Sequence, residues 1–228
     1  MKTIVSFVLT GFFAVCALFA PKTARAATIT VTSTNDSGAG TLRQAITSPN
    51  GNPGLDTIVF SIGSGAKTIK PLSPLPAITS PAVIDGTIQP GFSGAPIIEL
   101  EGSAAGLANG LNIESGGCTV KGLVINRFAY SGIALVTNAY KPIEGNYIGT
   151  TAAGTASAAN GNGGIIIVNS PGNIVGGATT SVRNVISGNT REGIAILNSA
   201  SRSNLVEGNY IGFDYTGTQS LSNSGGRA

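Results

Sequence analysis

The sequence predicts an all-β chain that winds as a single-stranded, right-handed parallel β-helix, with a short capping helix at its N-terminal end. Three observations support this fold class. Segments recur with a period of about 30 residues, short runs of β-branched residues are separated by Gly, Asn and Ser, and no stretch has the periodicity of a long amphipathic helix.

The repeat is clearest in the second half of the chain. The hexapeptide EGNYIG at positions 144–149 returns unchanged at positions 207–212, a shift of 63 (207 − 144). A second element reads GIALV at positions 132–136, GIIIV at 164–168 and GIAIL at 193–197. Its copies are 32 (164 − 132) and 29 (193 − 164) residues apart, so two such intervals are about as long as the shift of the hexapeptide. The middle unit has NIVGG at positions 173–177, which aligns with NLVEG at 204–208 and stands where EGNYIG would otherwise fall. The shift of the hexapeptide therefore spans two coils.

Equivalent residues of successive coils are expected to stack. Alternation along a strand puts Ile133 on the same face as Ile165 of the next coil and Ile194 of the one after. Coils about 4.8 Å apart then build a continuous dry interior, and no coil can bury its apolar face alone.

Asparagines that follow strands are expected to form turns, because Asn tolerates left-handed backbone and can stack in hydrogen-bonded ladders. These residues are Asn138, Asn169, Asn189, Asn198 and Asn209. Turn formation explains them better than ligand binding does.

The N-terminal half repeats less regularly. We expect strands at residues 28–32, 57–62, 82–85, 97–100, 110–113 and 119–125, and irregular corners at Pro71, Pro74, Pro76, Pro81, Pro90 and Pro96. Residues 41–46 read as a short helix with Thr41 and Gln44 at capping-box spacing. This helix could cover the open end of the first coil, whose unpaired edge would otherwise recruit other strands.

The first residues predict export. An apolar run at residues 4–20 follows Lys2, and Ala24-Arg25-Ala26 has the small-x-small pattern of a signal-peptidase site. We therefore expect a signal peptide at 1–26, an N-terminal cap segment at 27–56 and β-helix coils at 57–228. A membrane anchor is the alternative, but the run is at the short limit for spanning a bilayer, and no membrane-spanning segment is expected after cleavage.

The order of a signal, an ITVTSTNDSGAGTLRQAI opening, a DTIVF strand and GNYIG- and GI-type coils resembles bacterial right-handed parallel β-helix repeat proteins, including the N-terminal regions of autotransporter-like surface passengers. The resemblance covers nearly the whole mature chain. It implies a secreted, periplasmic or cell-surface location, and it is specific for architecture rather than activity, since such proteins include pectin-degrading enzymes and adhesins. Residues 217–226 match 154–164, where the earlier coil continues directly into a strand, so we expect an N-terminal fragment or a truncated product of a longer protein.

Composition excludes several function classes. The formal net charge of +3 disappears on cleavage, because 3 of the 13 basic residues leave with the signal and the remaining 10 balance 10 acidic residues. A neutral chain with scattered bases predicts no nucleic-acid partner. Histidine is absent, which removes Ser-His-Asp and Cys-His nucleophile systems. Cys118, the single cysteine after the signal, is expected to be a buried hydrophobe rather than an intermolecular thiol.

Carboxylates are the remaining catalytic candidates, because β-helix enzymes acting on polysaccharides use paired acids or Ca²⁺-binding acids. Glu99 and Glu101 share one face of a strand, Asp85 follows a strand about one coil earlier, and Asp214 lies in a protruding loop. Together they could hold Ca²⁺ or act on a sugar. The competing interpretation is that they are solvated surface charges that keep sheet faces from associating.

Two other groups carry weaker signals. Phe213 and Tyr215 flank Asp214 and are candidates for carbohydrate contact, although exposed loop aromatics need no ligand. Glu144 and Glu207 are equivalent in the repeat but two coils, about 9.6 Å, apart, which is wide even for an inverting carboxylate pair.

The sequence thus favours a noncatalytic secreted or cell-surface scaffold that serves adhesion or carbohydrate contact, with an extracellular glycan or a host-surface ligand as partner. The alternative is a polysaccharide lyase or glycoside hydrolase. No cofactor is expected beyond Ca²⁺, and the sequence leaves the oligomeric state open.

Overall fold

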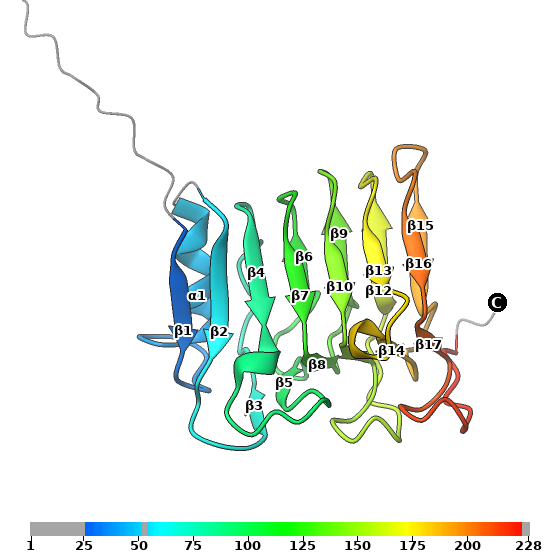
Figure 1. The fold of residues 1–228 in the computed structure, drawn as a ribbon, viewed down its shortest axis with the longest axis horizontal. Helices are drawn as coiled ribbons and strands as arrows, with labels where there is room; N and C mark the ends of the chain where they lie inside the picture. Colours follow the sequence, from blue (N-terminus) through cyan, green and yellow to red (C-terminus); the bar gives the residue numbers. More distant parts are fainter. Residues whose placement is uncertain (1–25, 52–53, 225–228) are drawn as a thin grey trace, which may run out of the picture.

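A computed structural model describes residues 26–51 and 54–224 of the chain as a parallel β-helix of about six turns. Three parallel sheets run along it, and equivalent strands of successive coils lie side by side (Figure 1). Sheet A contains β1 (Thr28–Val31), β2 (Asp56–Phe60), β4 (Ala82–Asp85), β7 (Thr119–Lys121), β10 (Pro142–Glu144), β13 (Ile174–Gly176) and β16 (Leu205–Glu207). Sheet B contains β3 (Lys67–Ile69), β5 (Ile98–Glu101), β8 (Leu123–Asn126), β11 (Tyr147–Ile148), β14 (Val185–Ile186) and β17 (Tyr210–Ile211). Sheet C contains β6 (Leu111–Ile113), β9 (Ser131–Val136), β12 (Gly163–Val168) and β15 (Ile194–Leu197).

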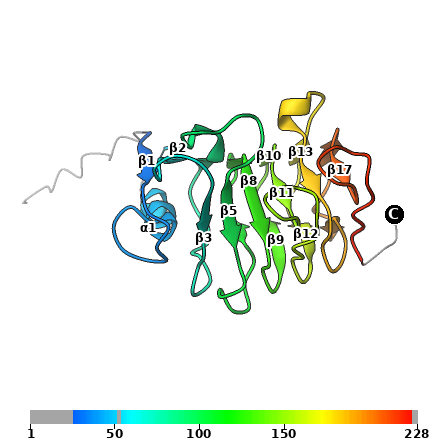
Figure 2. The same cartoon turned by 90° about the horizontal axis from the view of Figure 1, so that it is seen from below.

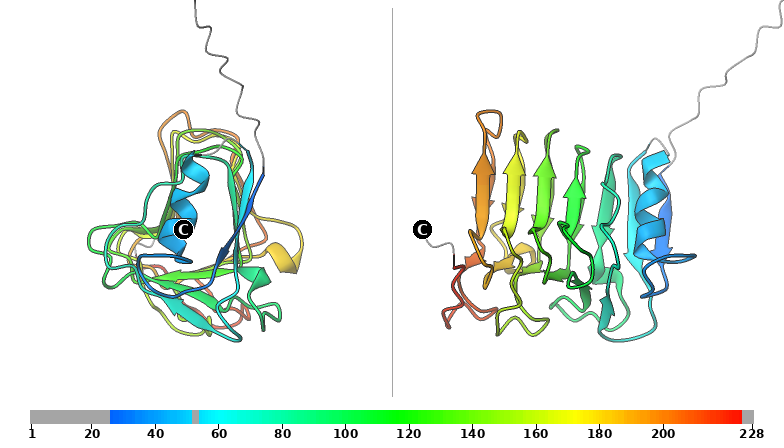
Figure 3. Two further views of the ribbon diagram at one scale, coloured as in Figure 1. Left: turned by 90° about the vertical axis from the view of Figure 1, so that its left-hand side faces the viewer. Right: turned by 180° about the vertical axis from the view of Figure 1, so that it is seen from behind.

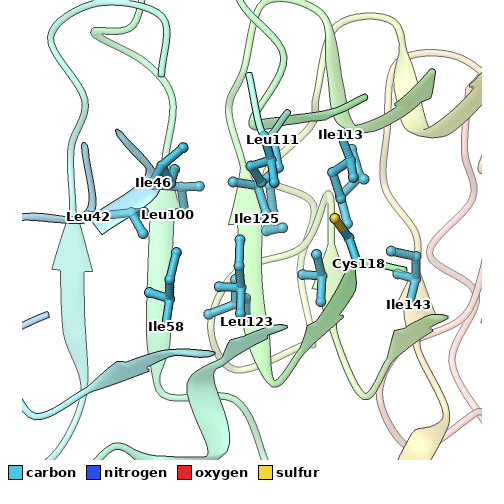
Figure 4. Close-up of a cluster of buried hydrophobic side chains, with 14 of the residues drawn as sticks. Leu42, Ile46, Ile58, Leu100, Leu111, Ile113, Cys118, Leu123, Ile125 and Ile143 are labelled. Atoms are coloured by element: carbon cyan, nitrogen blue, oxygen red, sulfur yellow. The ribbon is translucent and has the colours of Figure 1, made fainter. Parts of the chain in front are cut away.

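The predicted stacking is confirmed by the register. Ile165 on β12 pairs with Ile133 on β9 and with Ile194 on β15. Inward-pointing residues of the three sheets form one apolar core, and Figure 4 shows part of it. Cys118 lies within this core and is 1% exposed, so its predicted role as a small buried hydrophobe is confirmed.

The capping helix is also present as predicted. Helix α1 (Leu42–Thr47) begins after Thr41, whose Oγ1 accepts a hydrogen bond from the Gln44 N–H at 3.3 Å, while the Gln44 side chain accepts one from the Gly40 N–H at 2.8 Å. Its apolar face, with Leu42 and Ile46, belongs to the main core. Seen along the axis, α1 lies across the N-terminal end of the superimposed coils (Figure 3).

The strand prediction for residues 119–125 was wrong in one respect. The chain forms two strands there, β7 and β8, because Gly122 adopts a positive φ of 70° and turns the chain from sheet A into sheet B. Strand β3 was missed, since so short a strand next to Pro71 gives too little pattern to recognise. The six prolines expected at corners all lie outside the strands. Three short 3₁₀ helices complete the described elements: η1 (Pro49–Gly51), η2 (Gly86–Ile88) and η3 (Thr180–Val182).

Asparagine side chains form ladders inside the corners. Asn146 donates from its backbone N–H to Oδ1 of Asn184 at 2.9 Å, and the Asn184 N–H donates to Oδ1 of Asn209 at 3.2 Å. Asn160 and Asn189 are joined in the same way at a second corner. The expectation of left-handed backbone is confirmed at Asn138, Asn169 and Asn198, which have φ of 37°, 50° and 70°. Asparagine thus satisfies buried backbone groups where the strands end.

The middle unit departs from the simple repeat. Gly176 pairs with Glu207, as the alignment predicted. The equivalent of the GNYIG segment, however, is formed by β14, which follows an insertion that carries η3. In the last coil Ile196 is 45% exposed, since no coil follows it within the described residues.

Candidate functional site

Six polar residues line an open groove of about 550 Å³ on the outer face of sheet B. Its lining residues lie on or just after β3, β5 and β8. These three strands are hydrogen-bonded neighbours in sheet B and lie side by side in Figure 2. Ile98 and Leu100 of β5 point into the core, so Glu99 and Glu101 point outward, which confirms that these two carboxylates share one face. The lining residues are Thr68, Lys70, Glu99, Glu101, Ser103 and Arg127.

Glu99 is held by donors from the neighbouring coils. Its Oε2 accepts a hydrogen bond from the Thr68 hydroxyl at 2.8 Å, and its Oε1 accepts one from Nδ2 of Asn126 at 2.8 Å. The guanidinium of Arg127 approaches Oε1 at 3.6 Å. The side chain of Glu99 remains 17% exposed, and both of its oxygens have partners.

Glu101 is more deeply enclosed, with a side chain 5% exposed. The Lys70 ammonium lies 3.1 Å from Oε2, the Ser103 hydroxyl donates to Oε2 at 3.0 Å, and the Ser103 N–H donates to Oε1 at 3.3 Å. Burial raises the pKa of Glu101, but the hydrogen bonds from Ser103 and the charge of Lys70 outweigh it, and the net pKa is lowered. Glu101 therefore stays ionised at neutral pH.

The two cations of the groove are exposed to solvent. The side chains of Lys70 and Arg127 are 61% and 43% exposed. Arg127 spans both carboxylates, with Nε 3.9 Å from Glu101, and its backbone has a positive φ of 57°. Such a conformation is uncommon for a non-glycine residue, and it directs the chain from β8 into the corner beside the groove.

Asp85 does not join this groove. It lies on β4 in sheet A, where its Oδ2 is 2.9 Å from the Lys121 ammonium and its Oδ1 accepts from the Thr87 N–H and hydroxyl at 2.9 and 2.6 Å. Its role is to cap η2 and to pair with the next coil. The sequence placed Asp85 near Glu99 because the coils before residue 110 have no regular repeat from which to count.

Asp214 holds together its own loop. Its carboxylate accepts hydrogen bonds from the Thr216 hydroxyl at 2.7 Å, the Thr218 N–H at 3.1 Å and the Gln219 N–H at 3.2 Å. Burial raises the pKa of Asp214, but these bonds and one from Gly217 lower it overall. The carboxylate thus forms an Asx-type turn, a structural role that leaves it no free oxygen for acid catalysis.

The aromatic residues beside Asp214 remain accessible. Phe213 is 44% exposed and Tyr215 is 49% exposed. The backbone of Tyr215 is fixed, since its N–H donates to the Gly154 carbonyl at 3.0 Å and so joins two loops that are two coils apart. The Tyr147 ring lies beneath, against Gly154.

The remaining candidates do not form a reactive set. Glu144 and Glu207 both pair in register with other residues of sheet A, with Gly176 on the strand between them. In the two described stretches, no three acidic or cysteine side chains lie close enough together to hold a metal ion. Residues 26–51 and 54–224 also contain no helix of the length and hydrophobicity needed to cross a bilayer.

The chain matches no protein-family model, and no curated protein matches it significantly. Architecture is thus what the chain demonstrably has in common with β-helix repeat proteins.

Proposed function

We propose that this chain is a noncatalytic, exported β-helix scaffold that contacts extracellular glycans through the groove on sheet B. The observation that supports a noncatalytic role is the state of the four candidate acids. Each is already hydrogen-bonded or ion-paired within its own chain, and the pKa values of Glu101 and Asp214 are lowered. A general acid needs a pKa raised towards the working pH, which is the opposite shift.

The groove is suited to contact with sugar hydroxyls. Ionised carboxylates accept hydrogen bonds from hydroxyls, and the exposed Lys70 and Arg127 can donate to ring and hydroxyl oxygens. Its charges balance, two acids against two bases, so a neutral or a weakly acidic glycan fits better than a polyanion. Because the site is built on three strands of a rigid sheet, it needs little rearrangement on binding.

A glycan array and a panel of neutral and uronic-acid polysaccharides test this proposal. The double variant Glu99→Gln/Glu101→Gln should weaken binding about tenfold or more, the value of a charge-assisted hydrogen bond. Glu144→Gln on sheet A is the matched control and should bind normally, and far-UV circular dichroism checks folding. A parallel variant, Phe213→Ala/Tyr215→Ala, tests whether the aromatic loop contributes.

Two results would overturn the proposal. Silence of the wild-type protein on every glycan would remove the contact role. Cleavage of any polymer, with or without Ca²⁺, that is lost in Glu99→Gln/Glu101→Gln would establish a polysaccharide-active enzyme instead.

A further inference from the structure

A column of aligned residues runs along the corner where the chain enters sheet A, and it is buried except at its two ends. It is formed by the residue at, or just before, the start of each strand, and the register of β1, β2, β4, β7, β10, β13 and β16 aligns them. We call it the entry column. Its members are Ala27, Asp56, Ala82, Cys118, Lys141, Asn173 and Asn204.

The last two members show how a polar side chain is satisfied at this position. Oδ1 of Asn204 accepts from the backbone N–H of Asn173 at 2.8 Å, and its Nδ2 donates to the carbonyls of Ser170 and Ser201 at 3.2 and 3.1 Å. The Asn204 amide therefore accepts from an N–H of the preceding coil and donates to one carbonyl of that coil and one of its own coil. Asparagine, with one acceptor and one donor group, satisfies the corner completely.

Asp56 takes the same position in the second coil but has a different chemistry. Its Oδ1 accepts from the N–H of Ala27 at 2.7 Å, as Asn204 does from Asn173. The residue is fully buried, and its Oδ2 has no hydrogen-bond partner. None of the ion pairs among residues 26–51 and 54–224 includes Asp56. A buried carboxylate without a cation is costly, and asparagine at this position would avoid that cost.

We propose that the cation for Asp56 is the α-ammonium group of Ala27, created when the chain is cut between Ala26 and Ala27. In the uncut chain the Ala27 nitrogen is an amide with one N–H, which Oδ1 already uses. Cleavage turns the same atom into an ammonium with three donors and a positive charge, 2.7 Å from the carboxylate. Both residues flanking the bond are exposed, so a peptidase can reach it. The inference rests on the export part of the proposed function and not on glycan contact.

Cleavage after Ala26 would stabilise the pairing of β1 with β2 in the first coil. The Thr57 N–H donates to the Ala27 carbonyl at 2.8 Å, so the ion pair and the start of the β1–β2 ladder share one residue. Hydrogen bonds involving charged groups are about twice as strong as neutral ones. The mature N-terminus would thus be a structural part of the β-helix rather than a free tail.

The test uses the full 1–228 chain, exported from a bacterial host. Intact-mass analysis of the exported protein should find Ala27 as the first residue. A second version carries Gly-Ser inserted between Ala26 and Ala27, so that cleavage after Ala26 leaves an amide at Ala27. Each version is also made with Asp56→Asn, which is the residue that the column uses at positions 173 and 204 and should therefore fold.

Hydrogen exchange in the β1–β2 ladder is the readout. The insertion should lower protection of the Thr57 amide about tenfold or more, and Asp56→Asn should remove that difference. The inference would be overturned if the Thr57 amide were equally protected with and without the insertion. It would also be overturned if the insertion lowered that protection as much in Asp56→Asn as in the wild-type background. A mature N-terminus at any other residue would also overturn it, and so would a chain that keeps Met1, which would favour the uncleaved membrane anchor. Glycan binding is scored separately, so failure there leaves this result intact.

Discussion

Replacing Asn184 with alanine tests the claim that the side-chain ladders, and not the strands alone, hold the coils together. Its Oδ1 accepts from the backbone N–H and Nδ2 of Asn146 at 2.9 and 3.1 Å, and its Nδ2 donates to the Ile143 carbonyl at 2.7 Å and to Oδ1 of Asn209 at 2.9 Å. Asn184→Ala leaves the backbone N–H of Asn146 without its partner and removes the side-chain hydrogen bond to the Ile143 carbonyl, which keeps its place in the ladder between β10 and β13.

An unpaired buried N–H costs about 1–3 kcal/mol and the lost hydrogen bond to the carbonyl about 1 kcal/mol, so the free energy of unfolding should fall by about 2–4 kcal/mol. Asn209→Ala is the matched control. Asn209 occupies the last rung, where it is partly exposed and water can replace its bonds, so the loss should be about 1 kcal/mol or less. Urea unfolding followed by far-UV circular dichroism measures both, and hydrogen exchange at residues 146–148 localises the effect. Equal losses for the two variants would refute the ladder as a stabilising element.

Two further predictions concern other buried positions. Lys141 is fully buried and donates to the carbonyls of Thr137 and Asn138, and burial lowers its pKa from 10.5 to about 8. As the pH rises, the folded state therefore loses this proton at a lower pH than the unfolded chain does, and the free energy of unfolding should increase by up to about 3 kcal/mol between pH 8 and 10.5. Urea titrations at several pH values should show this increase in the wild-type protein and not in Lys141→Met. No difference in pH slope between the two proteins would contradict this account. Ile167→Ala should lower the free energy of unfolding by about 2–5 kcal/mol in the same assay. Ile196 pairs with Ile167 in register but is 45% exposed, so Ile196→Ala should cost about 1 kcal/mol. A larger loss for Ile196→Ala than for Ile167→Ala would argue against a dry interior at β12.

The sequence was sufficient to predict which residues stack wherever one coil could be aligned with another. The column of Ile133, Ile165 and Ile194 and the pairing of Gly176 with Glu207 follow from repeats of nearly constant length. Asn184 was not predicted to be a ladder residue because the coil lengths vary locally. The ladder steps are 38 residues from Asn146 to Asn184 and 25 from Asn184 to Asn209, which together equal the shift between the two copies of EGNYIG.

The groove could be predicted only in part, for a related reason. The shared face of Glu99 and Glu101 needs no more than strand alternation, which the sequence displays. Lys70 lies in the coil before Glu101 and Arg127 in the coil after Glu99, and no repeated motif in that region sets the register. The positive φ of Arg127 leaves no signature in the sequence either.

The outer face of sheet B explains why the groove lies where it does. Residues in register across the sheet change along the axis from polar to apolar, from Thr68 and Glu99 to Val124, Tyr147 and Val185. The apolar residues are buried, and protruding loops pack over this half, as Gly154 does on the Tyr147 ring. At the polar half, an ionised carboxylate gains nothing from an apolar cover and needs donors or water instead. Charge at Glu99 and Glu101 therefore keeps this half open, while the regular coils beyond it supply the rigidity on which a binding surface depends.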